Sequence, residues 1–337
     1  MRSTITVSTP EDIGLFHSLT AVGATPSAKP TDIAMPEGDR HLVTLENDEA
    51  VARCSLWWRA TAQLESARLG YIGHFAARSD TGALALLEHA CRSLAAAGCT
   101  RAVGPIDGNT WHRYRFVTER GDEPPFFLEP DNPDQWPQAF RDAGFDALAH
   151  YGSALETDVH SVDPRVPELR NRMQQLEVRI REFEPQQFDQ EVDRIFDVSS
   201  ESFRSAFLYS PIERSQCHAI YEPLKQYVRA ELAFIAEQRD RPVGFVFALP
   251  DWAEAQRGAR IETAIVKTIA ILPDKQYSGL GALLLATCRA RIAELRYTRT
   301  IHALMHDGNV GSRSLSDRFG RQMRGYTLFA RDVAAER

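Results

Sequence analysis

The chain has 337 residues, of which 43% are hydrophobic and 25% are charged, as in ordinary globular proteins. Its formal net charge of −7 does not suit a protein whose main partner is nucleic acid, because phosphate backbones attract clustered Lys and Arg. The five cysteines are scattered and never spaced C-x-x-C, which predicts a reduced cytoplasmic protein without structural zinc, its cysteines being small core residues. No run of eighteen apolar residues occurs and the first residues lack the apolar core of a secretion signal, so we expect no membrane span.

Hydrophobic periodicity predicts a series of strands and helices in the first half of the chain. Strands are expected at 41–46, 51–58, 68–76, 101–105 and 147–155, and helices around 84–94 and 136–140. Gly98 and Gly144 follow the two helices, where glycine suits a C-terminal cap.

The second half repeats this order of elements. A helix is expected at 188–203, a hairpin at 232–237 and 243–249, and a central strand at 261–272, followed by a helix at 280–295, a strand at 300–306, a helix at 309–319 and a strand at 325–331. The repetition indicates an internal duplication, with α/β architecture in each half. Prolines and polar residues at 158–168 predict a linker between domains spanning 1–157 and 169–337.

The strongest local pattern lies where the predicted central strand meets the following helix. The loop consists of Gln276, Tyr277, Ser278, Gly279, Leu280 and Gly281. The first turn of a helix has unpaired N–H groups and the positive end of the helix dipole, and glycines let a phosphate approach the backbone. The spacing matches neither a dinucleotide fingerprint nor a P-loop. A plain strand-to-helix turn that needs two glycines is the alternative interpretation.

This loop resembles the acyl-coenzyme A signature of the GNAT superfamily of N-acetyltransferases: Gln or Arg, two residues, Gly, one residue, then Gly or Ala. A second signature of the family, an Asn followed by a small residue and a short helix, is similar to Asn309, Ser312 and the residues up to Gly320. The two matches cover the C-terminal half, while the N-terminal half is similar in element order.

The resemblance implies a fold of two tandem acyl-CoA N-acyltransferase-like domains, each a mixed, mostly antiparallel sheet flanked by helices. It also implies that acetyl-CoA or another acyl-CoA is the co-substrate, with no metal. Backbone N–H groups from Gln276 to Gly281 would hold the pyrophosphate. The pantetheine arm would pair with a strand edge and accept a hydrogen bond from Asn309, which alternatively is a plain helix N-cap; the strand edge consists of Ala270, Ile271 and Leu272.

The corresponding loop of the first half, 77–83, lacks the leading Gln or Arg and the second glycine, and it contains Asp80. We therefore expect one cofactor site per chain, in the second half, and a degenerate copy in the first half.

The catalytic groups are less well defined by the sequence. In many family members a tyrosine protonates the departing thiolate, and Ser316 stands at the matching position here. Tyr326 on the last strand is a substitute, unless it only packs in the core. His302 and His306 alternate onto one face of their strand, and His306 is the better candidate because it lies closer to the loop that follows; an ordinary hydrogen-bonded histidine is the alternative.

A polar and aromatic cluster after the strand at 101–105 is a candidate acceptor site. It contains Asp107, Asn109, Trp111 and Arg113, and the loop at 129–133 is expected close by. Asp107 would hold an ammonium group, and Arg113 or Arg115 a carboxylate. The alternative interpretation is a turn without a ligand, in which the aromatic side chain packs against the protein and the arginines are exposed to solvent.

We therefore predict an acyl-CoA-dependent N-acyltransferase, using acetyl-CoA or a similar donor, that acts on a small amine-containing metabolite. The alternative is a non-catalytic acyl-CoA sensor or interaction protein. The oligomeric state stays open. We also expect Gly279→Glu to abolish coenzyme A binding and to leave the fold intact.

Overall fold

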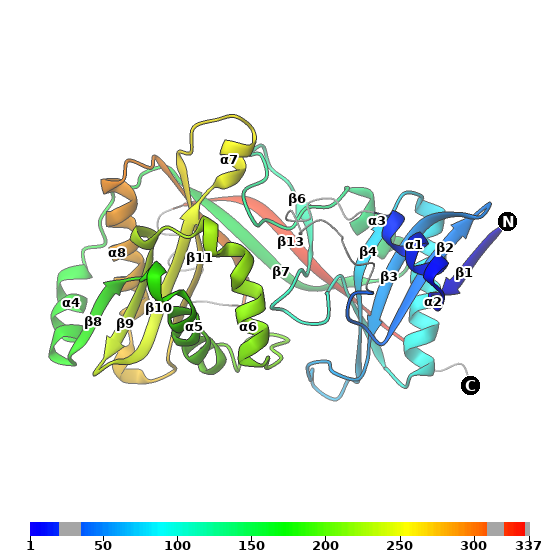
Figure 1. Ribbon diagram of the computed structural model, residues 1–337, viewed down its shortest axis with the longest axis horizontal. Helices are drawn as coiled ribbons and strands as arrows, with labels where there is room; N and C mark the ends of the chain where they lie inside the picture. Colours follow the sequence, from blue (N-terminus) through cyan, green and yellow to red (C-terminus); the bar gives the residue numbers. More distant parts are fainter. Residues whose placement is uncertain (20–34, 309–319, 334–337) are drawn as a thin grey trace.

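The computed structural model describes residues 1–19, 35–308 and 320–333. Its strands belong to one continuous mixed sheet that runs through both halves of the molecule, with helices packed on it (Figure 1). The α/β fold class predicted from the sequence is confirmed.

The first half follows the predicted order, with additional short elements. They are β1 (Arg2–Thr6), α1 (Pro10–Ser18), β2 (Arg40–Glu46), β3 (Glu49–Trp57), β4 (Leu69–Ala77), α2 (Asp80–Ala96), β5 (Arg101–Gly104), β6 (Phe116–Glu119), α3 (Gln135–Asp142) and β7 (Asp146–Glu156). Gly98, in the left-handed region at φ 86°, follows α2, and the N–H of Cys99 donates to the carbonyl of Leu94. This is the glycine cap expected after the helix.

The second half also follows the predicted order. Its helices and strands are α4 (Val166–Gln175), β8 (Val178–Glu182), α5 (Phe188–Ser202), α6 (Arg214–Tyr221), β9 (Ala233–Gln238), β10 (Arg241–Pro250), α7 (Trp252–Gln256), β11 (Thr263–Ile271), α8 (Leu280–Glu294), β12 (Arg299–His306) and β13 (Arg321–Asp332). Short 3₁₀ turns cover Pro185–Gln187, Glu222–Tyr227, Ala230–Leu232 and Lys275–Tyr277. The helix predicted at 309–319 lies outside the described residues. Helix α4 begins inside the segment predicted as a linker.

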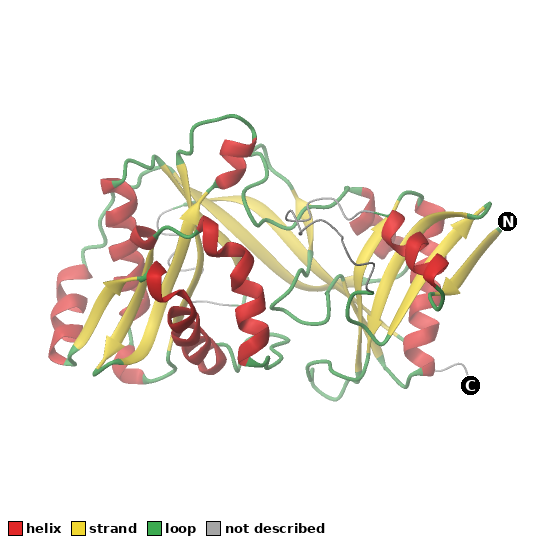
Figure 2. Cartoon of the chain, viewed as in Figure 1, coloured by secondary structure: helices red, strands yellow, loops and turns green. Residues whose placement is uncertain are grey.

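Two long strands carry the sheet from one half into the other. The sheet order is β1-β2-β3-β4-β5-β13-β7-β12-β11-β10-β9-β8, with β6 paired to β13. The last strand of the chain, β13, therefore lies between β5 and β7 of the first half, and β7 in turn pairs with β12 of the second half. Figure 2 shows these strands crossing the middle of the molecule. Each half therefore contributes one strand to the other half's part of the sheet, and we call this arrangement the strand exchange. The predicted domain boundaries stay a prediction.

Each half has its own hydrophobic core, and a third cluster lies between them. The core of the first half gathers α2 and α3 on the sheet, and the core of the second half gathers α5 and α8. In the second half, α5 and α6 cover one face of the sheet while α4 and α8 cover the other (Figure 1). The central cluster contains Tyr151, Tyr326 and Leu328 from the two exchanged strands together with Leu208 from the second half. This cluster packs the halves against each other.

All five cysteines are buried, as expected for core residues. Burial raises the pKa of Cys91 and Cys217 to about 11 and that of Cys288 to about 12. A thiol at such a pKa is protonated near neutral pH and is a weak nucleophile.

None of the helices described here is long and apolar enough to cross a membrane.

Because β13 pairs with β5 and with β7, which in turn pairs with β12, a destabilising substitution in β13 should lower the stability of both halves. Leu328 is fully buried in the central cluster, so Leu328→Ala should lower the free energy of unfolding by about 2–5 kcal/mol. Hydrogen exchange should then accelerate in β5 as well as in β12, whereas Val162→Ala, at a residue that is 75% exposed, should change neither. Acceleration confined to one half would contradict the exchange.

Candidate functional site

Strands β11 and β12 run side by side at their starts and then part. They pair in parallel from Thr263 to Val266 on β11 and from Arg299 to His302 on β12, and no described pairs follow. β11 continues to Ile271 and stays paired with β10 on its other side. Residues 267–271 therefore leave one strand edge without a described partner. An open edge of this kind accepts an extended ligand as an additional strand.

Helix α8 begins next to the end of β11 with an uncapped first turn. Gly279 is its N-cap in the left-handed region at φ 84°, and no side chain caps it. The backbone N–H groups of residues 279–282 have no hydrogen-bond acceptor among the described residues. Unpaired N–H groups together with the helix dipole make this end of α8 a site for an anion such as a phosphate.

The loop before this helix is held by its own polar side chains. The carboxylate of Asp274 accepts hydrogen bonds from the Gln276 backbone N–H at 3.0 Å and from its side-chain Nε2 at 2.8 Å. The Tyr277 hydroxyl donates to Gln238 Oε1 at 2.7 Å. These bonds fix the turn, and they occupy part of the predicted phosphate site, because the N–H groups of Gln276, Tyr277 and Ser278 donate to Asp274 and Lys275 within the turn. Among the described residues of the loop, the N–H groups from Gly279 onward remain for the pyrophosphate, and whether they bind it stays a prediction.

Gly279 also packs closely against α4, a contact that the sequence did not reveal. A β-carbon at Gly279 would lie 2.6 Å from Leu169 Cδ2 and 3.8 Å from Arg172 Nη2. Gly279→Glu would therefore strain both the backbone and this contact, so we expect it to lower stability as well as binding, and whether the fold stays intact is still a prediction. Arg172 places a cation beside the uncapped turn, where it suits a phosphate.

The corresponding helix start of the first half is closed. Ser79 Oγ caps α2 by accepting from the Gly82 N–H at 3.1 Å. The Glu46 carboxylate accepts hydrogen bonds from Ser79 and from Thr81 Oγ1, the latter at 3.0 Å. A cap and a carboxylate at this position disfavour phosphate.

In the first half, the position between the parting strands is filled by the loop that follows β5. β4 and β5 pair only from Leu69 to Tyr71 and from Arg101 to Val103. Beyond that point Ile106 donates its N–H to the carbonyl of Ile72, and the Asp107 carboxylate accepts the N–H of His74. The loop after β5 thus takes the position that stays open in the second half.

The four residues predicted to bind the acceptor lie in that loop, and their polar groups are partly used within the protein. Asp107 is committed to His74, and Asn109 Oδ1 accepts the Trp111 N–H at 2.9 Å. Arg113 donates to the carbonyl of Asp131, so the loop at 129–133 does lie close by. Trp111 reaches the second half: its Nε1 donates to the Ser210 carbonyl at 3.0 Å, and its ring lies 6.2 Å from that of Tyr209. Their role in substrate binding stays a prediction.

Of the predicted catalytic residues, His306 lies at the end of β12 near the open edge. Its ring stacks on Phe207 with centroids 5.3 Å apart and meets Tyr151 edge-on at 4.9 Å. Its Nδ1 accepts the Gly308 N–H at 3.1 Å, so the neutral ring carries its proton on Nε2. Burial lowers the pKa of His306, opposed by Asp307 and assisted by Arg115, which favours this neutral form.

His302 does not share the face of His306, contrary to the expected alternation. Leu304 adopts a left-handed conformation at φ 61°, and the pairing of β12 with β7 shifts register between His302 and Met305. His302 is buried instead, with its Nε2 2.9 Å from Glu156 Oε2. The extra residue of such a bulge reverses the side-chain alternation that follows it.

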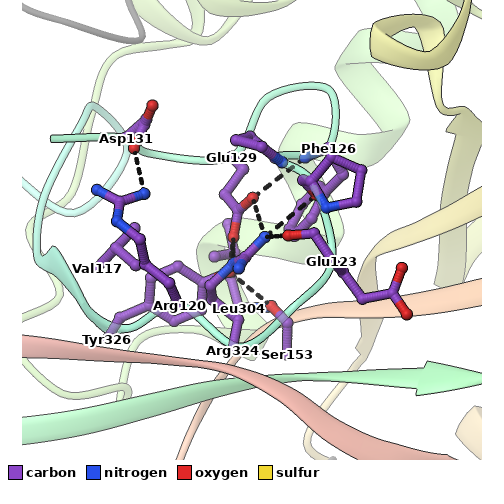
Figure 3. A network of polar contacts seen from close by, with 12 residues as sticks. Val117, Arg120, Glu123, Phe126, Glu129, Asp131, Ser153, Leu304, Arg324 and Tyr326 are labelled. Carbon is purple, nitrogen blue, oxygen red and sulfur yellow. Dashed lines mark hydrogen bonds and ion pairs between the residues drawn. The ribbon is translucent and has the colours of Figure 1, made fainter.

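Tyr326 is buried at the junction of the halves in a polar network (Figure 3). Its hydroxyl donates to Glu129 Oε1 and lies 3.0 Å from Ser153 Oγ. Glu129 also receives Arg324 Nε at 2.8 Å. Burial and then the Glu129 charge raise the pKa of Tyr326 well above its usual value, so the phenol holds its proton tightly. The remaining predicted residues Ser316, Asn309 and Ser312 lie outside the described residues.

Lys267 is a candidate functional residue that the sequence analysis missed. It is the bulged residue of β11, because Phe247 pairs with Thr268 while Ala248 pairs with Val266. Burial first, and then the Arg115 guanidinium, lower its pKa to about 7, while Glu129 acts in the opposite direction. Lys267 forms no ion pair with a residue that the structure describes. The available signal was a single lysine inside an otherwise apolar strand pattern.

Comparisons with known proteins bear on the second half most directly. The sequence model of the acetyltransferase (GNAT) family matches residues 192–320. The chain is 25% identical over 198 residues to a bacterial ceramide synthase of Caulobacter vibrioides, a match that covers 58% of this chain and 51% of that protein. This chain therefore spans about half the length of the curated relative it matches.

Solved structures are similar over nearly the whole chain. A tandem GNAT protein from the clavulanic acid biosynthesis pathway superimposes with a TM-score of 0.51 at 8% identity and 100% coverage of both chains. A glucosamine N-acetyltransferase region of a fungal multi-domain β-N-acetylglucosaminidase gives a TM-score of 0.56 at 11% identity, covering 98% of this chain and 38% of that one. These likenesses confirm the predicted tandem fold.

The pKa of Lys267 predicts a pH-dependent stability. The unfolded chain keeps this proton up to the ordinary pKa of 10.5, and the folded chain only up to about 7. Between these values the unfolded state binds more protons, so Lys267 should make the free energy of unfolding rise with pH. Denaturation of wild type and Lys267→Met from pH 6 to pH 10 should show the variant more stable at pH 6, with a difference that shrinks as pH rises. A difference independent of pH would contradict the lowered pKa.

Proposed function

The chain belongs to the GNAT superfamily in a tandem arrangement, and on this premise we propose that it transfers an acyl group from an acyl-CoA thioester to an amine. The family is one of acyltransferases; the amine acceptor and the acetyl group as donor are our inference. One observation carries the proposal: four N–H groups at the start of α8, without an acceptor among residues 1–19, 35–308 and 320–333, lie directly beyond the edge of β11 that has no described partner. A ligand with a pyrophosphate joined to an extended amide arm matches both features at once.

The positions of the predicted cofactor residues agree with this ligand. The pyrophosphate would bind the N–H groups of the turn that starts at Gly279, with Arg172 as an additional cation. The amide arm would pair with the edge of β11 at residues 270–272. The first half, in which both equivalent positions are closed, would bind no acyl-CoA. One cofactor site per chain follows from this asymmetry.

The chemistry needs a free amine and a proton for the thiolate. In the transfer, the amine nitrogen attacks the thioester carbonyl carbon, a C–N bond forms, and the C–S bond breaks. Lys267, with its pKa of about 7, is suited to accept the proton of the ammonium form near neutral pH. His306 donates a hydrogen bond from its Nε2–H to the departing sulfur and stays neutral, whereas the Tyr326 proton is already donated to Glu129. The proton that the nitrogen loses as the C–N bond forms goes to the sulfur and gives the free thiol.

The names of two similar proteins bear on the acceptor. One is named a bacterial ceramide synthase and the other a glucosamine N-acetyltransferase region, and the second name describes acylation of an amine. A small amine-containing metabolite as acceptor and acetyl-CoA as donor remain the working proposal, because neither similarity selects an acceptor or a chain length.

The proposal is tested at Gly281 and not at Gly279. A β-carbon at Gly281 would meet Ile271 Cγ1 at 3.6 Å, an ordinary contact, so a side chain can be added there. In Gly281→Glu the carboxylate would compete with the pyrophosphate at the helix start, while the helix itself would gain about 0.5–1 kcal/mol from the loss of glycine. We expect calorimetry to show at least a tenfold loss of coenzyme A affinity with an unchanged or raised melting temperature.

Gly281→Gln is the matched control, because it has the same size without the charge. It should retain more affinity than the Glu variant, and equal affinity of wild type and Gly281→Glu would contradict the phosphate site. Release of free thiol from acetyl-CoA on adding amines then separates an enzyme from a sensor. Binding without thiol release for a broad amine panel would favour the acyl-CoA sensor.

A further inference from the structure

Three of the arginines that the structure describes are almost completely buried, and one of them differs from the others. Arg289 and Arg324 are each 3% exposed and donate to carboxylates, Arg289 Nε to Glu156 at 2.9 Å and Arg324 Nε to Glu129 at 2.8 Å. Arg115 is 5% exposed, yet its Nε and Nη1 have no hydrogen-bond partner among the described residues. It forms no ion pair with a described carboxylate either, and its side-chain hydrogen bond is to the neutral hydroxyl of Tyr151. A buried charge without a counter-charge is unfavourable and unusual.

Aromatic rings hold the flat face of this guanidinium. Its carbon lies 4.1 Å from the ring centroid of Tyr114 and 4.4 Å from that of Tyr151. The backbone of Arg115 is in the left-handed region at φ 66°, and its N–H donates to the Pro105 carbonyl at 2.9 Å. Stacking uses the faces of a guanidinium and leaves the N–H groups at its edge to bind a ligand. The side chain is thus fixed in position without a counter-charge.

The surrounding groups do not supply the missing negative charge. Burial raises the pKa of Tyr151 despite the nearby Arg115, so its phenol stays neutral. The Arg115 charge lowers the pKa of both Lys267 and His306, which shows that these basic groups lie close to it. Glu129, the carboxylate that acts on Lys267, is already bonded to Arg324 and Tyr326. The described residues around Arg115 therefore carry an excess of positive charge.

Arg115 lies beside the end of β12. It comes from the loop of the first half and packs at 4.4 Å on the ring of Tyr151, whose ring in turn lies 4.9 Å from that of His306. In the proposed reaction we place the acceptor at this end of β12. The geometry points to Arg115 as the binding site for an oxyanion of the acceptor: the amine substrate also carries a carboxylate or a phosphate. This inference rests on the proposed function for the identity of the ligand as an acceptor.

The melting temperatures of two variants distinguish an arginine that binds a ligand from one that stabilises the fold. Arg115→Met removes a charge that has no counter-charge and keeps an apolar side chain between the tyrosines, so the melting temperature should stay the same or rise. Arg324→Met should lower it, because Glu129 is left buried without its cation. A fall in Arg115→Met as large as that in Arg324→Met would assign Arg115 a structural role and overturn the inference.

The activity test uses amines in matched pairs with acetyl-CoA. Glycine is compared with glycinamide, and phosphoethanolamine with ethanolamine, so that the two arms distinguish a carboxylate from a phosphate. For wild type we expect kcat/KM to favour the anionic member of at least one pair by tenfold or more. In Arg115→Met this ratio should collapse, mainly through KM, and Arg115→Lys should restore part of it. Equal kcat/KM within both pairs would overturn the inference.

A binding measurement keeps the inference separate from the proposed function. Glycine and phosphoethanolamine are titrated without coenzyme A, and the melting temperatures of wild type, Arg115→Met and Arg2→Met are followed. Arg2 is the control: it lies on β1, at the end of the sheet order, and pairs with Glu46 at 2.8 Å. Stabilisation of wild type and Arg2→Met but not Arg115→Met supports the oxyanion site even if no amine releases thiol. The same response in all three proteins, or none in wild type, contradicts it.

Discussion

The antiparallel ladder between β7 and β13 is the interaction on which the rest of the molecule depends. It joins the last strand of the first half to the last strand of the chain, and each of them borders the other half. Because these strands are exchanged, the loop after β5 is carried next to the open end of β12. Two residues of the first half are therefore placed against the second half: Trp111 contacts Ser210 and Tyr209, and Arg115 packs on Tyr151 beside His306.

The two halves share a topology, but the space between the parting strands is filled by the chain in the first half and not by described residues in the second. Both contain parallel strands that pair for a few residues and then part. In the first half the chain satisfies these groups itself, through Ile106, Asp107 and the Ser79 cap. In the second half the corresponding N–H groups and strand edge lack a described partner. At this point the two halves differ in whether their backbone groups already have hydrogen-bond partners within the chain.

Much of this could be predicted from the sequence, because local patterns determine local elements. Apolar periodicity predicted the main strands and helices, and the six residues from Gln276 to Gly281 predicted the uncapped helix start. The strand exchange was missed because a strand's own pattern does not specify its neighbours. The alternation rule failed for His302 and His306 because Leu304 takes a left-handed conformation that its residue type does not announce. The lowered pKa of Lys267 was missed because it depends first on burial of the side chain and then on Arg115, which is distant in sequence.

The position of β13 also determines when the protein can be completed as it is made. Asp332 bonds to Arg101 across a sequence separation of 231 residues, and the two strands they belong to are neighbours in the sheet. During synthesis β5 leaves the ribosome long before β13, the strand that pairs with it. Until β13 has emerged, the backbone groups at this edge of β5 have no strand partner. Such contacts form slowly and leave nascent chains prone to association. A protein built in this way completes the sheet of its first half only after residues 321–332 have emerged.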